Sequence, residues 1–274
     1  MFKTRLISGV FLVAAAVLIL WLGSGPTLIV TAALSLIGEF ELCRVYGIEK
    51  SSIGYIAYIW TILYYAMFAF DEYSLFGFEV LRLDRPMLVM YIIAVLSLYV
   101  IQFPKYSDKQ MLAAYMAFFY VGVMLLHIYK IRNLENGGCY VVLLFLCSWG
   151  NDTLAYVTGR LFGRHKMSPV LSPKKSKEGL VGGIVGAGLL GWLYGLMMRS
   201  VLGDDVPVKF MIICALGAIP AVIGDLAASG IKRNNDVKDY GTIIPGHGGV
   251  LDRFDSMIFT APLIYYLLRF AIHG

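Results

Sequence analysis

Long apolar stretches dominate this sequence and leave few folds open to it. A helix needs about 20 mostly apolar residues to cross a bilayer, and nine stretches approach that length. They lie at residues 6–22, 27–43, 53–70, 87–103, 111–129, 139–158, 180–198, 208–229 and 254–272. Because 59% of the 274 residues are hydrophobic and 15% are charged, a soluble domain, a disordered chain and a disulfide-stapled secreted fold are excluded. We expect an all-α, polytopic integral membrane protein with about nine transmembrane helices in one bundle.

The basic residues indicate an orientation. Membrane proteins concentrate Lys and Arg in cytoplasmic loops, and most of the 23 basic residues fall on that side if the N-terminus is cytoplasmic. Lys3 and Arg5 precede the first stretch as in a signal peptide, but no small-residue cleavage site follows, so we expect a retained span in the cell membrane. The stretch at 27–43 is short and carries Glu39 and Glu41, so the orientation of every later loop depends on whether it crosses the membrane.

Ionisable groups divide the chain into two regions. Residues 1–135 have short loops and few such groups within spans, as is typical of a scaffold for a bundle or a dimer. Residues 136–274 contain cytoplasmic loops at 159–179 and 230–250, and each adjoining span carries an acid. An ionisable residue within a span is a functional-site candidate. The two acids are Asp152 and Asp225.

The loop at 159–179 is strongly basic. It holds a single acid, Glu178, and six basic residues, namely Arg160, Arg164, Lys166, Lys174, Lys175 and Lys177. One interpretation is a loop resting on anionic lipid; the other is a clamp that presents lysines to phosphoryl oxygens. Charge alone does not decide between them. The helix that follows, 180–198, has glycines four residues apart, which favours close helix packing over a direct role in a site.

The second loop brings acids and cations to one membrane boundary. On a helix, Asp225, Ser229 and Lys232 share one face. The ninth helix is expected to begin near Val250, which places Asp252, Asp255 and Ser256 in its first turn. Carboxylate oxygens suit Mg²⁺ held together with substrate phosphates. The neighbouring cations, which suit a triphosphate, are Lys232, Arg233, Lys238 and Arg253.

These groups are the inventory of phosphoryl or nucleotidyl transfer, where catalysis is mostly positioning and charge neutralisation. The alternative is that Asp225 and Asp252 pair with arginines only to make their burial tolerable. Before the ninth helix, three glycines leave backbone amides exposed, as an anion-binding loop requires. We expect this loop to contact nucleotide or phosphate through Gly246, His247, Gly248 and Gly249.

Two stretches resemble a known family. Ser229-x-x-Lys232-Arg233, Lys238-Asp239 and His247-Gly248-Gly249-x-x-Asp252-Arg253-x-Asp255 are similar to the signature of the phosphatidate cytidylyltransferases, or CDP-diacylglycerol synthases. So are Asn151-Asp152-Thr153, Gly159-Arg160-x-x-Gly163 and the run from Ser172 to Gly179, except that Lys177 stands where many members have an aromatic residue. The resemblance is specific over residues 148–260.

The resemblance implies an Mg²⁺-dependent enzyme of phospholipid synthesis that converts CTP and phosphatidate into CDP-diacylglycerol and pyrophosphate. It implies that Asp225 and Asp252 hold the metal, with Asp255 supporting, and that the enzyme is a homodimer without a nucleic-acid partner. The residues expected to neutralise the phosphates are Lys174, Lys175, Lys232, Arg233, Lys238 and Arg253. Ser229 and Asp152 complete the expected catalytic set, and Asn151 and Lys177 are expected to contact nucleotide or phosphate.

Two other functions have similar requirements. A CTP-dependent lipid kinase of the polyprenol or phytol type would use comparable acids and bases but release CDP. A transporter for an organic phosphate would use the lysines as an anion site, but such proteins show broken helices paired across two similar halves. The two halves of this chain are dissimilar.

Overall fold

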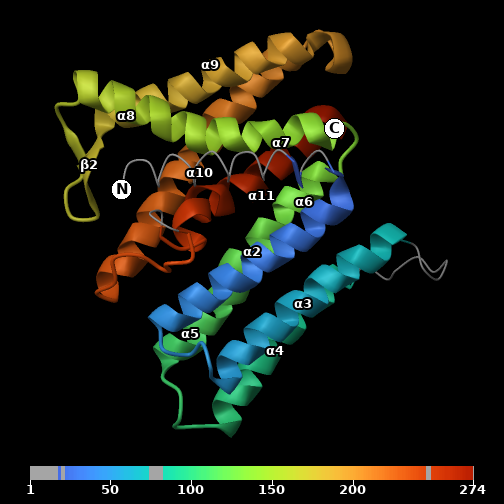
Figure 1. Cartoon of the computed structure of the whole chain (residues 1–274), viewed down its shortest axis with the longest axis vertical. Coiled ribbons are helices and arrows are strands. Elements are labelled where there is room, and N and C mark those ends of the chain that lie inside the picture. Colours follow the sequence, from blue (N-terminus) through green and yellow to red (C-terminus); the bar gives the residue numbers. More distant parts are fainter. Residues whose placement is uncertain (1–17, 20–21, 74–82, 245–247, 274) are drawn as a thin grey trace. The chain divides into compact units, whose positions relative to one another are not determined.

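The computed structural model describes residues 18–19, 22–73, 83–244 and 248–273. Most of the first expected span, with Lys3 and Arg5, lies outside these residues, and so do Gly246 and His247. Apart from one short hairpin, the named elements of the described chain are all helices (Figure 1). In chain order the helices are α2 (Ser24–Val45), α3 (Ser52–Tyr73), α4 (Asp84–Ile101), α5 (Asp108–Met116), η1 (Ala117–Val123), α6 (Met124–Arg132), α7 (Gly137–Phe145), η2 (Leu146–Gly150), α8 (Asn151–Phe162), α9 (Lys177–Leu202), α10 (Val206–Asn234) and α11 (Leu251–His273).

Six segments of the described chain are long and apolar enough to cross a membrane. They are Ser52–Ala69, Asp84–Ile101, Asp108–Arg132, Gly137–Phe162, Lys177–Leu202 and Val206–Asn234, and each coincides with an expected span. Helices α2 and α11 coincide with the expected spans 27–43 and 254–272 and have 22 and 23 residues, but they are not among these six segments. An all-α membrane protein is therefore confirmed, whereas the count of nine spans is not.

The hairpin is a departure from the expected loop at 159–179. Strands β1 (Lys166–Ser168) and β2 (Ser172–Ser176) pair antiparallel, with Lys166 opposite Ser176. In Figure 1 this hairpin connects the end of α8 to the start of α9. Of the expected loop, only the part between these two helices is non-helical. The loop expected at 230–250 is likewise shortened, because α10 continues to Asn234.

The chain packs as two compact units. One unit consists of Met1–Tyr129 with Val237–Arg253, and the other of Lys130–Asp236 with Phe254–Gly274. Segment 237–253 therefore packs with the N-terminal helices, although it follows α10 in the sequence. The roles expected for residues 1–135 and 136–274 stay a prediction, because packing does not assign a role to either part.

Each unit has a core that explains its helices. In the first unit, Tyr91 of α4 is fully buried, its ring centroid lies 4.3 Å from that of Phe118, and its hydroxyl donates to the Ala114 carbonyl. In the second unit, glycines of α9 allow close approach on two sides. Gly186 lies against Leu154 of α8, and Gly191 lies against Cys214 of α10. The packing role expected for the glycines of 180–198 is thus confirmed.

Candidate active site

Lys175 and Asp225 form an ion pair in the second unit. Lys175 lies on β2 and Asp225 near the end of α10, and the Lys175 Nζ atom contacts the Asp225 Oδ2 atom. Both side chains are about one-third exposed, at 28% and 31%. The basic hairpin therefore directs this lysine toward an acid of a neighbouring helix. A purely lipid-facing loop would not explain that contact.

Asp255 joins the same cluster because α11 packs closely on α10. Gly224 of α10 lies against the main-chain carbonyl of Asp255, where a Cβ atom would collide with it. Asp255 is 8% exposed, and its carboxylate accepts a 2.7 Å hydrogen bond from the Ser256 amide and interacts electrostatically with Asp225. Lys232 and Asp152 also interact electrostatically with the Asp255 carboxylate. Three carboxylates and two lysines, expected separately from the sequence, are thus brought together.

Asn151 is buried and directly precedes Asp152 of this cluster in the sequence. Its side chain is fully buried, and neither its amide oxygen nor its amide nitrogen has a hydrogen-bond partner among the described residues. The oxygen faces α9 at Gly183, where a Cβ atom would collide with it. Leaving a buried polar group unsatisfied costs about 1–3 kcal/mol. Asn151 therefore offers a donor and an acceptor that no described residue of the protein uses.

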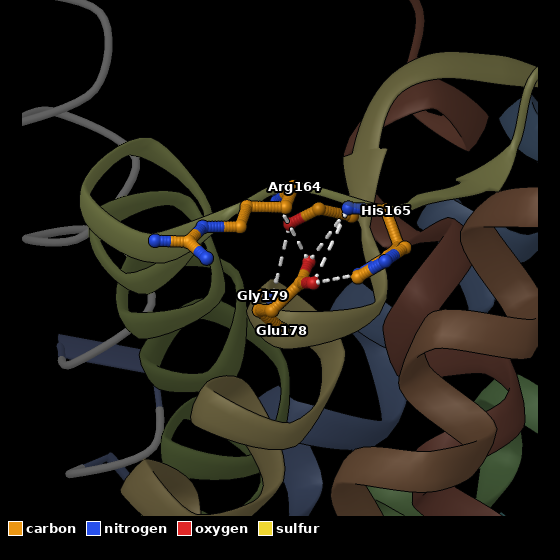
Figure 2. A network of polar contacts seen from close by, with 5 residues as sticks. Arg164, His165, Glu178 and Gly179 are labelled. Carbon is orange, nitrogen blue, oxygen red and sulfur yellow. Dashed lines mark hydrogen bonds and ion pairs between the residues drawn. The ribbon is translucent and has the colours of Figure 1, made fainter.

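Glu178 closes the base of the hairpin. Figure 2 shows its carboxylate accepting hydrogen bonds from the backbone amides of Arg164, at 3.1 Å, and His165, at about 3.2 Å. The same carboxylate pairs with the His165 Nδ1 atom at 2.6 Å. Ser176 adds an N-cap on α9 by accepting a 3.1 Å hydrogen bond from the Gly179 amide. The single acid of the basic loop therefore fixes the ends of the hairpin that presents Lys175.

Asp252 lies in the first unit, at the start of α11. Its Oδ2 atom accepts hydrogen bonds from the Tyr240 amide at 2.8 Å and the Gly249 amide at 3.0 Å. Gly248 has a φ of +89°, a backbone conformation that favours glycine. A Cβ atom there would also lie 2.9 Å from Asp252 Oδ2, so the available space favours glycine as well. The Gly249 amide, expected to face a phosphate, therefore donates to Asp252. Gly246 and His247 lie outside the described residues.

Other expected site residues are solvent-facing or half-buried. Ser229 and Lys232 lie on α10 after Asp225 and are half-buried. The expected residues with exposed side chains are Asp152, Lys174, Lys177, Arg233, Lys238 and Arg253. The lysines and arginines of this list are therefore open to a ligand in solution.

Sequence reasoning missed Glu41. This residue of α2 accepts hydrogen bonds from the Val250 and Leu251 amides at the start of α11. In the sequence, Glu41 is one of two acids that distinguish the stretch at 27–43 from the other expected spans. An acid within an apolar stretch is itself a functional signal.

The acids of the described residues are candidate metal ligands. Among the residues that the structure describes, no group of three or more His, Cys, Asp or Glu side chains is arranged to hold a metal ion. Mg²⁺ is commonly held by one or two carboxylates, with substrate phosphates and water as the remaining ligands. The carboxylates of Asp225 and Asp255, which lie together in the second unit, are ligands of the type that this mode of binding uses.

Comparison with known proteins agrees with the chemistry of these groups. A phosphatidate cytidylyltransferase of Bacillus subtilis is 30% identical over 269 residues, which is 97% of each chain. A protein of the same name from Staphylococcus saprophyticus is 38% identical over 63% of this chain and 65% of its own, and one from Staphylococcus epidermidis is 39% identical over 64% and 65%. The model of the cytidylyltransferase family matches residues 3–271. Because that match covers nearly the whole sequence, this chain belongs to the cytidylyltransferase family.

Proposed function

We propose that this protein is a phosphatidate cytidylyltransferase of phospholipid biosynthesis, which transfers CMP from CTP to phosphatidate. The observation that carries the proposal is the cluster of Lys175, Asp225 and Asp255, because it combines a phosphate-binding cation with acids suited to a metal. The relatives named as phosphatidate cytidylyltransferases support the choice of substrates.

The reaction makes limited demands on the protein. An oxygen of the phosphatidate phosphate attacks the α-phosphorus of CTP, and the bond from that phosphorus to the β-bridging oxygen breaks. The bonding electrons leave with pyrophosphate, and the products are CDP-diacylglycerol and pyrophosphate. Because the lipid phosphate is ionised at neutral pH, no strong general base is needed. The protein must instead bring two polyanions together and neutralise them.

The cations of the chain perform that neutralisation. Lys175 and Lys232 already lie in the acidic cluster, where they can exchange a carboxylate for a phosphoryl oxygen. The remaining cations proposed for the triphosphate, the lipid phosphate and the leaving pyrophosphate are Lys174, Arg233, Lys238 and Arg253. Ser229 and Asp152 complete the proposed catalytic set.

Nucleotide contacts come from buried and loop positions. The unsatisfied amide of Asn151 would gain its hydrogen bonds from the nucleotide. Lys177, Gly246, His247, Gly248 and Gly249 are proposed as further nucleotide or phosphate contacts.

We further propose Asp225 and Asp252 as carboxylate ligands of Mg²⁺, with Asp255 supporting them. When bound, Mg²⁺ supplies positive charge to the triphosphate oxygens. The hydrogen bonds from Tyr240 and Gly249 orient the Asp252 carboxylate. Asp225 also forms an ion pair with Lys175.

The placement in the membrane extends the proposal. We propose nine spans in the cell membrane, with α2 and α11 among them, a cytoplasmic N-terminus and a site at the cytoplasmic boundary. The basic hairpin supports that side, because Lys and Arg accumulate in cytoplasmic loops. Such a site lets the acyl chains stay in the bilayer during the reaction. A homodimer with residues 1–135 as its scaffold completes the proposal.

A labelling experiment tests the function. Detergent-purified protein is incubated with phosphatidate, Mg²⁺ and CTP labelled at the α-phosphorus. Label in a chloroform-soluble lipid, with one pyrophosphate released per lipid, is the expected result. Label that stays in water as CDP once a polyprenol is supplied would instead indicate the lipid kinase, and no turnover with any lipid would contradict both enzymes.

A further inference from the structure

Glu41 of α2 caps the start of α11 from a distant part of the sequence. Its Oε1 atom accepts a hydrogen bond from the Val250 amide at 3.0 Å, and its Oε2 atom accepts one from the Leu251 amide at 2.8 Å. The first amides of a helix have no partner within that helix, and a negative charge there is favoured by the helix dipole. Glu41, which is 1% exposed, thus does what a local capping side chain usually does.

The loop before α11 is shaped around this carboxylate. Gly241 and Gly249 both lie so close to the Glu41 carboxylate that a Cβ atom on either would collide with it. Arg44 lies one turn further along α2 and donates a hydrogen bond to the Tyr240 carbonyl. Two side chains of α2, of opposite charge, therefore hold the two ends of the loop.

The same loop orients Asp252. The two amides that bind Asp252 Oδ2 belong to Tyr240 and Gly249. The first of these residues is bound by Arg44, and the second is packed on Glu41. We propose that Glu41, assisted by Arg44, is a positioning residue that sets the orientation of the Asp252 carboxylate. This inference rests on the proposed function, in which Asp252 is a metal ligand.

The neighbouring acid Glu39 shows that this role is not a general property of acids on α2. Glu39 is fully buried, and its Oε1 atom accepts a hydrogen bond from the Thr61 hydroxyl. Its Oε2 atom has no hydrogen-bond partner in the described part of the chain. Burying a polar group is unfavourable unless it is hydrogen-bonded. Thr61 supplies a hydrogen bond to Glu39, whereas the first amides of α11 supply the hydrogen bonds to Glu41. Glu39 therefore provides a matched control two residues away.

The test compares Glu41→Gln with Glu39→Gln in the full-length protein in detergent. A glutamine at position 41 can accept only one of the two amide hydrogen bonds and sets its own N–H₂ against the other donor. Hydrogen–deuterium exchange of the peptide covering 240–252 reports on the loop without requiring turnover. We expect its amides to exchange roughly tenfold or more faster in Glu41→Gln, and to exchange as in wild type in Glu39→Gln.

The kinetic readout distinguishes positioning from general stability. We expect kcat/KM of Glu41→Gln to fall about 10- to 100-fold, with a raised Mg²⁺ requirement, as when a group orienting a metal ligand is lost. The thermal midpoint should stay close to that of Glu39→Gln, and Glu41→Asp should recover part of both the loop protection and the activity.

Several outcomes would overturn the inference. Unchanged loop exchange in Glu41→Gln would do so, as would equal losses of activity in the two glutamine variants. If Glu41→Gln fails to fold, Arg44→Lys decides the question by the same two measurements, because it loosens the other end of the loop. If wild type shows no cytidylyl transfer, the proposed function fails, while the exchange data still report whether Glu41 holds the loop.

Discussion

The ammonium group of Lys175, on the β1–β2 hairpin, is paired with the carboxylate of Asp225, near the end of α10. This contact joins the basic hairpin to α10, the helix that precedes the second polar connection. It also gives each partner a reason for its position, because a partly buried acid and a partly buried lysine neutralise each other. Removing either partner disturbs the charge balance of this cluster, in which Lys175 also interacts with Asp152.

Asp225→Asn should abolish cytidylyl transfer while the protein still inserts and folds. Asparagine keeps the shape of the side chain but supplies no negative charge for Mg²⁺ or for Lys175. The measurement is label transfer from CTP to lipid, beside size-exclusion chromatography in detergent. Asp205→Asn is the control, since Asp205 lies at the far end of α10 and pairs only with Lys209 among the ion pairs of the described chain. Near-normal turnover of Asp225→Asn would exclude the metal assignment.

Lys175→Ala should lower kcat/KM about a hundredfold, the usual cost of losing one donor to a charged reaction centre. The matched control is Lys166→Ala, a lysine of the same hairpin on β1 that is exposed. Steady-state kinetics with CTP and phosphatidate varied separately would show which substrate the lysine serves. Equal effects of the two substitutions would mean that the hairpin acts through its total charge and not through Lys175.

The sequence predicts the apolar helices and the types of residue in the site, because both depend on local pattern and composition. The span at 111–129 and the packing glycine Gly186 are examples. It does not predict the hairpin, since Ser172–Ser176 contains serine, proline and lysine and has little strand propensity of its own. The hairpin depends on Glu178, which binds two amides from the other side of the turn.

Contacts between distant segments are also beyond a single sequence. Glu41 caps the start of α11 although the two are 210 residues apart in the sequence. The periodicity of a sequence does not indicate which helix end an acid will cap. The hydrogen bond from the Gly249 amide to Asp252 is a contact of the same kind, which the glycine pattern alone does not indicate. The local pattern shows that these segments contain acids and glycines. Which groups hydrogen-bond to one another becomes known only from the fold.

Glu178→Gln should loosen the hairpin without unfolding the protein. The His165 side chain is 74% exposed, and ion pairs of that kind contribute about 0–1 kcal/mol. The amides of Arg164 and His165 lose part of their acceptor, however, so the hairpin should be cut faster by a lysine-specific protease. Comparing cleavage rates at the hairpin with the thermal midpoint checks this, and a midpoint that falls steeply would show that Glu178 supports more than the hairpin.

Gly191→Ala should destabilise the second unit, and Gly188→Ala should not. A Cβ atom at position 191 would lie 2.7 Å from the Cys214 Sγ atom, whereas at position 188 its nearest neighbour is 3.4 Å away. Overpacking of this kind costs about 1–3 kcal/mol, while alanine in place of glycine within a helix gains up to about 1 kcal/mol. Thermal unfolding of both variants in one detergent measures the difference, and equal midpoints would mean that α9 and α10 are not closely packed at Gly191.

Asn151→Leu should separate stability from function. Leucine has a similar shape, and it removes two buried polar atoms that have no partner in the described chain. The unfolding free energy of the ligand-free protein should therefore rise by about 1–3 kcal/mol. CTP binding should weaken, because the nucleotide loses the donor and the acceptor proposed to satisfy it. Calorimetry with CTP and thermal unfolding, run on the same preparation, test both halves. A leucine variant that gained stability and still bound CTP as wild type does would remove Asn151 from the nucleotide site, since its amide would then be unsatisfied with the ligand as well as without it.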